Sequence, residues 1–143
     1  MIMKNKFFLF TFLLAIALLS ACHRETRTDI TESSWKVKSV TTYGLTRHVD
    51  WSDEFSMPDA YRLVFLNDTL FQLNTSINKA VGIYQFSPQE FIIYKYGTLT
   101  FVCCEEKLDK QLLHALPKVT SYKTKEKTLI LKGDGCTIKL VKE

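Results

Sequence analysis

Apolar and polar residues alternate in short stretches along most of the chain, the pattern of β-strands with one buried face. Turn residues such as Asn67-Asp68, Ser87-Pro88 and Gly133-Asp134-Gly135 separate these stretches. The stretches cover residues 35–40, 61–66, 69–73, 82–86, 90–96, 119–122, 128–131 and 136–141, and residues 98–104 continue in extended style. We therefore expect about eight short strands. Residues 44–60 show no sustained period and are predicted to form a surface loop, the part of the chain where family-specific function is expected.

The period changes between Glu105 and Leu116. Apolar side chains recur there at Leu108, Leu112, Ala115 and Leu116, a spacing typical of an amphipathic helix. Acidic residues in the first turn suit the helix dipole, and Pro117 ends the pattern. The fold class predicted is α+β, with an antiparallel sheet wrapped around one late amphipathic helix.

The N-terminus follows a different pattern. Lys4 and Lys6 precede an almost unbroken apolar run of 13 residues, 7–19, which is too short to span a bilayer. Leu19-Ser20-Ala21 then leads directly into Cys22, as at a lipoprotein-type cleavage site. We predict that residues 1–21 are removed as a signal peptide and that Cys22 is acylated, for example with palmitate. Residues 22–32 would form a tether and residues 33–143 the domain.

The predicted signal peptide and acylated Cys22 indicate that the protein is located in the cell envelope. The residue after Cys22 is His23 and not the Asp of the best-known inner-membrane retention signal, which favours the outer membrane, with the domain facing the periplasm. Removal of residues 1–21 leaves 17 basic and 15 acidic side chains, a balance that argues against a nucleic-acid partner. The sequence has no metal-ligand, nucleophile or phosphate-loop motif, so no metal, cofactor or enzymatic reaction is expected.

Besides Cys22, the chain has Cys103, Cys104 and Cys136. If Cys103 and Cys104 lie on a strand they point to opposite faces, so at most one of them can reach Cys136. A Cys104–Cys136 disulfide is one hypothesis, buried free thiols are the main alternative, and a vicinal bond between Cys103 and Cys104 would be strained.

Two further patterns allow a structural or a functional interpretation. Phe91, Tyr94, Tyr96 and Phe101 either pack in the core or form an exposed aromatic platform, and strand alternation places Tyr94 and Tyr96 on one face. Asp68-Thr69-Leu70 resembles the acceptor of a bacterial O-glycosylation system, on a turn that would expose Thr69. The alternative is a chance match of three turn residues.

The order of several residues resembles the META/HslJ-like domain of bacterial envelope proteins, over about residues 33–142. The matching residues are Trp35, Leu63-Val64-Phe65, Phe71-Gln72-Leu73, Asn78, Gly82-Ile83-Tyr84, Thr100, Cys103 or Cys104, Glu105-Glu106, Leu116-Pro117-Lys118-Val119-Thr120-Ser121-Tyr122 and Leu129-Ile130-Leu131. Ile77 stands where the family often has a cysteine, so a disulfide from that position is absent. The resemblance implies a role in envelope stress or drug tolerance, without an agreed reaction.

We therefore expect a non-enzymatic, membrane-anchored envelope lipoprotein that acts by protein or small-ligand contact. Its partners would be the membrane, through the lipid on Cys22, and an unknown envelope protein or small ligand. The alternative is a lipocalin-like carrier of a small apolar ligand. The two differ at Leu112 and Leu116, which would be exposed over an open barrel but buried if the helix fills the sheet.

Overall fold

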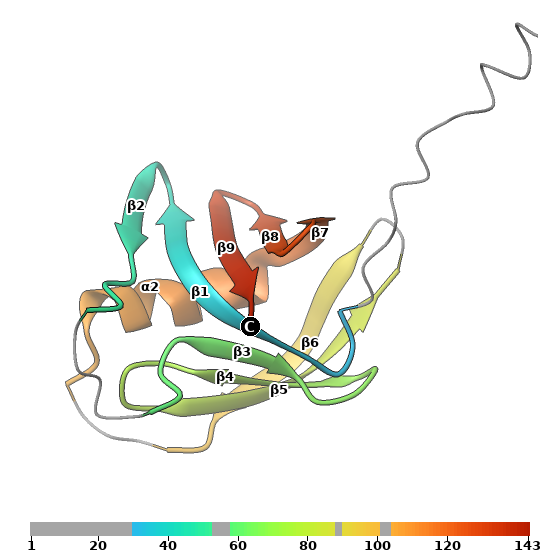
Figure 1. Cartoon of the computed structure of the whole chain (residues 1–143), viewed down its shortest axis with the longest axis horizontal. Helices are drawn as coiled ribbons and strands as arrows, with labels where there is room; N and C mark the ends of the chain where they lie inside the picture. Colours follow the sequence, from blue (N-terminus) through green and yellow to red (C-terminus); the bar gives the residue numbers. More distant parts are fainter. Residues whose placement is uncertain (1–29, 53–57, 88–89, 101–103) are drawn as a thin grey trace, which may run out of the picture.

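The computed structural model describes residues 30–52, 58–87, 90–100 and 104–143. This part of the chain forms nine strands and one α-helix followed by a short 3-10 helix (Figure 1). The elements are β1 (Ser33–Thr42), β2 (Leu45–His48), β3 (Arg62–Phe65), β4 (Leu70–Asn74), β5 (Lys79–Phe86), β6 (Phe91–Thr98), α2 (Lys107–Ala115), η1 (Leu116–Lys118), β7 (Val119–Lys125), β8 (Thr128–Gly133) and β9 (Cys136–Lys142).

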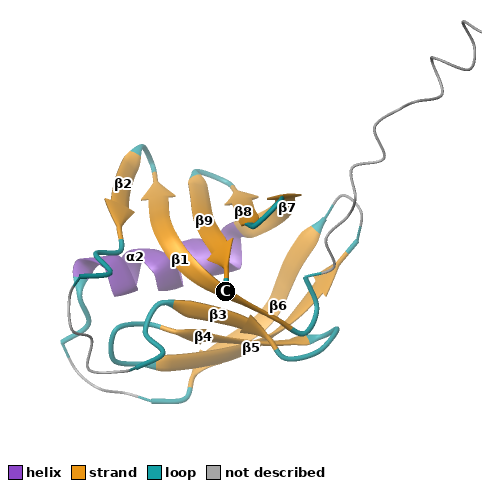
Figure 2. Ribbon diagram, viewed as in Figure 1, coloured by secondary structure: helices purple, strands orange, loops and turns teal. Residues whose placement is uncertain are grey.

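The strands form one antiparallel sheet in the order β6-β5-β4-β3-β1-β9-β8-β7, with β2 paired to β1. The sheet curls into a half-barrel, and α2 runs along its inner side (Figure 2). Because β9 closes onto β1, the last strand of the chain joins the first in the middle of the sheet. The predicted α+β fold is confirmed.

The core lies between the curled sheet and the helix. Leu112, Ala115 and Leu116 are fully buried, so the apolar face predicted for the helix is the face that packs inward. The sheet contributes aromatic side chains at Trp35, Phe65, Phe71, Tyr84 and Phe91. Ile30 is also fully buried, so the core begins three residues before the domain boundary expected at residue 33. In the described part of the chain, no helix has the length and apolar character needed to cross a membrane.

The predicted loop 44–60 contains a strand. Residues 45–48 form β2, which pairs with the end of β1, and the Thr41 and Thr46 hydroxyls share a hydrogen bond of 2.8 Å. Backbone pairing holds this strand, whose side chains are mostly exposed and polar, so no alternation of apolar residues marks it in the sequence. The expectation of an unpaired loop was wrong at these four residues.

Tyr94 and Tyr96 do not share a face. The pairing of β5 with β6 shifts register because Ile83 lies opposite Lys95 whereas Tyr84 lies opposite Ile93, which leaves Tyr94 as the extra residue of a β-bulge. Tyr94 is exposed, whereas Tyr96 packs against the core and donates a hydrogen bond of 3.0 Å to the carbonyl of Leu113. Phe91 is a core residue, and Phe101 lies outside the described residues, so these aromatics do not form the platform.

Gly82, in the Gly-Ile-Tyr step of β5, leaves room for an aromatic side chain. A Cβ at this position would lie 2.5 Å from both the Phe71 ring and the Lys95 carbonyl oxygen. Gly97 on the neighbouring strand has no atom within 4 Å of the corresponding position. The glycine at 82 is therefore required by packing, and the one at 97 is not.

Replacing Gly82 with alanine is expected to lower the free energy of unfolding by about 1–3 kcal/mol, because the new methyl group overpacks the core. The matched variant Gly97→Ala should change stability by less than about 1 kcal/mol, in the stabilising direction. Urea denaturation of both variants measures the difference. Equal effects at the two glycines would contradict this account of Gly82.

Candidate functional site

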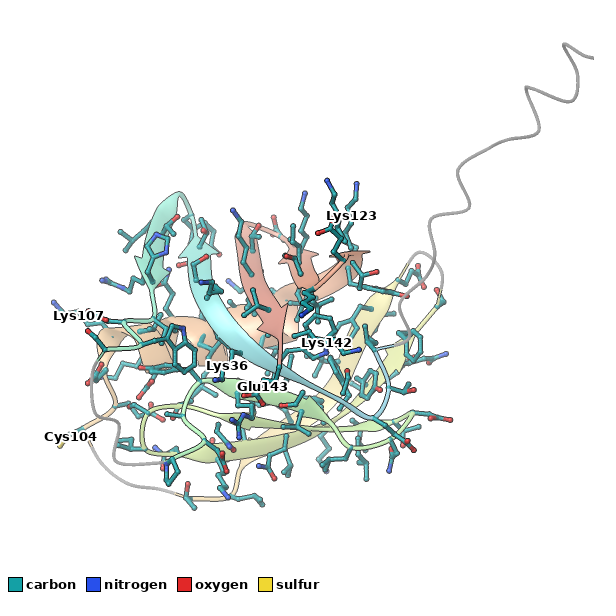
Figure 3. The ribbon with its side chains drawn as sticks, in the orientation of Figure 1. Lys36, Cys104, Lys107, Lys123, Lys142 and Glu143 are labelled. Carbon is teal, nitrogen blue, oxygen red and sulfur yellow. The ribbon has the colours of Figure 1, made fainter. Side chains whose placement is uncertain are left out.

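An open cleft lies between β2 with the residues that follow it and the N-terminal end of α2. It has a volume of about 580 Å³ and is lined by Thr46, Arg47, His48, Asp50, Tyr61, Glu106, Lys107 and Leu108. Lys107 projects from the start of the helix at one edge of the molecule, and Cys104 precedes it on the same side (Figure 3).

One wall of the cleft is β2, and Gln111 of α2 holds it in place. The buried Gln111 side-chain nitrogen lies 2.8 Å from the Leu45 carbonyl oxygen and 2.9 Å from the Thr42 hydroxyl. This single side chain therefore ties the β1–β2 hairpin to the helix. Arg47 and His48 line the same cleft as Glu106 and Lys107.

The floor of the cleft is Tyr61, which is buried and adopts a left-handed backbone conformation with φ 53°. This conformation is uncommon for a bulky residue and costs about 1 kcal/mol or more. The carbonyl oxygen of Tyr61 accepts a hydrogen bond of 2.8 Å from the Val37 amide, which secures the turn against β1. Burial, and secondarily the neighbouring Asp109 carboxyl group, raise the pKa of the Tyr61 phenol.

Beneath the floor, Asp109 is fully buried although it belongs to the first turn of α2. Its carboxyl group accepts hydrogen bonds from the Ser76 hydroxyl and, at 3.1 Å, from the Ser76 amide. Because a buried carboxyl group without partners would be costly, this contact fixes the helix against the β4–β5 turn.

The residues just before the helix are held by a second polar group. The Asn78 side chain donates a hydrogen bond of 3.0 Å to Glu105 and accepts one of 3.0 Å from the Thr100 hydroxyl. These three residues are separate in the sequence, and each belongs to the set that resembles the META/HslJ-like domain. Their shared role in the structure is to position the start of α2.

The cleft contains charges of both signs that are not paired with one another. Arg47 and Lys107 are basic, Asp50 and Glu106 are acidic, and no ion pair joins them among the residues that the structure describes. Hydrogen bonds from the Ser52 hydroxyl and amide lower the pKa of Asp50, so that group is ionised at neutral pH. Among the described residues, no three His, Cys, Asp or Glu side chains are gathered as metal ligands. The arrangement suits a dipolar ligand or a peptide segment with charges of both signs.

Sequence reasoning placed function in the loop 44–60, which contributes one wall of the cleft, but missed the contact of this loop with the start of α2. Residues 46–50 and 106–108 are far apart in the chain, and the contact depends on the pairing of β2, which no apolar pattern marks. The residues that were singled out lie elsewhere. Cys22 is outside the described residues, and Thr69 lies exposed in the β3–β4 connection, where the Asn67 side-chain oxygen accepts hydrogen bonds of 2.9 Å and 3.1 Å from its amide and hydroxyl. Glycosylation of Thr69 stays a prediction.

The structure does not form the Cys104–Cys136 disulfide. Cys136 is a buried free thiol whose sulfur lies 3.5 Å from the Ala115 carbonyl oxygen, at the C-terminal end of α2. Cys104 is exposed and precedes the N-terminal end of the same helix. The two residues are separated by about the length of the helix, ~12 Å at 1.5 Å per residue, which is too far for an S–S bond. Cys103 lies outside the described residues.

A curled antiparallel sheet with an internal helix and an open cleft at one end defines a small, mostly β domain. A family model described as "META domain" matches residues 28–143. The chain therefore belongs to the META domain family.

Two solved structures share this fold. A protein from Burkholderia xenovorans, studied by NMR, is similar with a TM-score of 0.61 and 18% identity, over 80% of this chain and 83% of the other. A DUF4847 family protein from Bacteroides vulgatus is similar with a TM-score of 0.55 and 12% identity, over 78% and 93% of the two chains. No curated protein matches the sequence. The similarity to these structures establishes the fold and no activity.

Alkaline pH should reveal the buried tyrosine. The pKa of the Tyr61 phenol is higher in the folded chain than in the unfolded chain, where it is about 10. The stability that Tyr61 contributes is therefore complete below about pH 10 and is lost as the pH rises above that value. Tyr61→Phe should therefore weaken the fall in unfolding free energy above about pH 10, measured by urea denaturation at a series of pH values. A slope in Tyr61→Phe that equals the slope of the parent chain would contradict the assignment.

The two described thiols should react at different rates. In a chain with Cys22→Ser and Cys103→Ser, a thiol reagent should label Cys104 quickly and Cys136 at least about tenfold more slowly, because burial raises the pKa of the Cys136 thiol. Both should react quickly in denaturant. A folded chain in which neither thiol reacts until a reductant is added would instead demonstrate the disulfide.

Proposed function

We propose that this META domain protein is a membrane-anchored envelope lipoprotein that acts by contact with a protein or a small ligand at the β2–α2 cleft. The anchor would be the acylated Cys22, and the setting would be the outer membrane, with the domain facing the periplasm. The resemblance to the META/HslJ-like domain supports a role in envelope stress or drug tolerance.

The observation that carries the contact role is the cleft with its mutually unpaired charges. Arg47, Asp50, Glu106 and Lys107 stand on a backbone that is fixed by Gln111, by Asp109 and by the bonds around Asn78. A surface whose backbone is held in this way loses little conformational entropy when a complementary dipolar partner binds. No bond-making chemistry is required for such a role.

A lipocalin-like carrier is less well supported. Such a carrier needs an open apolar interior, whereas Leu112 and Leu116 are each only 1% exposed and occupy the inner side of the sheet. The surface hollow that is present is lined mostly by polar residues. An apolar ligand would therefore compete with Leu112 and Leu116 for the inner side of the sheet, and in the surface hollow it would lie among charged side chains.

Site-specific crosslinking in the native envelope tests this function. A photoreactive residue at Thr46 in the cleft should give a defined adduct, while one at the exposed Thr120 on β7 should not. The adduct should be lost when Arg47 and Lys107 are both replaced by alanine. Mass spectrometry of the same sample reports whether Cys22 is acylated and whether residues 1–21 are absent.

The two parts of the proposal fail separately. Equal adducts from Thr46 and Thr120, or none from Thr46, would contradict the cleft as contact site. A chain that retains residues 1–21, or an unmodified Cys22, would contradict the lipid anchor whatever the crosslinks show.

A further inference from the structure

The outer face of β1, β9, β8 and β7 is basic. These four strands contain no acidic residue, and their lysines mostly occupy the positions that alternate with buried leucine, isoleucine and valine. The six lysines on this outer face are Lys36, Lys38, Lys123, Lys125, Lys132 and Lys139. Lys36 and Lys123 mark its extent from the middle of the sheet to its edge (Figure 3). We call this surface the basic face.

Strand pairing brings these charges close together. Lys123 and Lys139 both lie opposite Ile130, one on each side, so they are about two strand spacings, ~10 Å, apart. Lys132 is two residues from Ile130 along β8, a distance of ~7 Å. The Debye length at physiological salt is about 8 Å, which is comparable with these separations, so the repulsion between the charges is only partly screened.

Little in the described chain neutralises them. Of the six lysines, only Lys36 takes part in an ion pair within the described residues, at 3.3 Å from Glu143. The nearest acids along the chain, Glu126 and Asp134, lie in the turns at the ends of β8 and not on its surface. A concentration of like charge that is unbalanced within the domain is typical of a surface that meets an anionic partner.

An exposed indole ring borders the basic face. Trp51, in the loop after β2, is 39% exposed, and the Lys36 ammonium group lies 5.4 Å from its ring centroid. A tryptophan ring beside lysines suits the boundary between lipid headgroups and acyl chains, where one side is apolar and the other hydrated.

We propose that the basic face binds the surface of a bilayer that contains anionic phospholipids. The cations of these strands favour a lipid surface over a nucleic acid. They are all lysines, which act as point charges on diffuse headgroups, and not arginines, whose planar guanidinium group forms two parallel hydrogen bonds with a base or a phosphate.

The anchor inferred under the proposed function adds to this argument. Eight residues lead from Cys22 to the buried Ile30, which is at most about 28 Å of chain. A lipid on Cys22 would therefore keep the domain within reach of the bilayer, and the inference rests on the proposed function to that extent. The charge of the basic face exists without the anchor, so the two can be tested apart.

The test uses the chain from residue 22 onward with Cys22→Ser, which cannot carry the lipid but contains every described element of the fold. Co-sedimentation with vesicles of phosphatidylcholine and phosphatidylglycerol measures binding. We expect binding that needs phosphatidylglycerol and weakens as salt is raised. Lys123→Glu, Lys132→Glu and Lys139→Glu together should weaken it by at least about tenfold, since each lysine near an anionic surface contributes several-fold in affinity.

The matched control reverses three lysines outside both the basic face and the cleft, Lys79, Lys95 and Lys110, and changes the net charge by the same amount. This variant should bind within about threefold of the parent, and circular dichroism should show that both variants are folded. Equal loss in the two triple variants, binding to pure phosphatidylcholine, or binding to duplex DNA but not to vesicles would overturn the proposal. Failure of the lipid anchor would appear only in the mass of the Cys22 peptide from the native envelope, and not in this assay.

Discussion

The packing of α2 against the inner side of the sheet is the interaction on which the rest of the structure depends. A half-barrel exposes its concave apolar face to water unless another element covers it, and covering such a surface contributes about 25 cal/mol for each Å² of apolar area buried. The helix does this with Leu112, Ala115 and Leu116, which face Trp35 and the aromatic residues of β3 to β6 across a common core. Without the helix, the sheet would have to close further or find another partner.

Apolar packing alone would leave the helix free to slide or rotate, and buried polar contacts remove that freedom. Asp109 forms hydrogen bonds with the β4–β5 turn, Gln111 with the β1–β2 hairpin, and Glu105 with Asn78. Each contact is directional, and a buried polar group that loses its partner costs about 1–3 kcal/mol, so one register is strongly preferred. The same three contacts surround the cleft. The residues that fix the helix thus also give the cleft its shape.

The sequence predicts the parts of the structure that depend on apolar burial, but not the parts that depend on these polar contacts. The helix, the strand segments and the buried leucines follow from apolar periodicity, because burial selects one face at each repeat. Asp109 and Gln111 carry no such signal, because in a sequence they are typical of the solvated face of a helix. No sequence pattern marks the strand β2 or the bulge at Tyr94 either, since both are consequences of backbone pairing with a neighbouring strand. The candidate site depends on Asp109, Gln111 and β2, so it could not be assembled from the sequence.

The basic face shows how composition can conceal a charge pattern. The chain without its first 21 residues is almost neutral, and the lysines of the basic face are distributed over four short segments, none of which is a basic run. Only antiparallel pairing of β7, β8, β9 and β1 places them on one surface. Most of the compensating acids lie in turns and at the start of α2, so the domain is polarised although its net charge is small. The loop after β2 contributes Asp50 to the cleft and Trp51 to the border of the basic face. A domain lying on that face would therefore hold its cleft beside the lipid surface, where a partner confined to that surface would meet it at high local concentration.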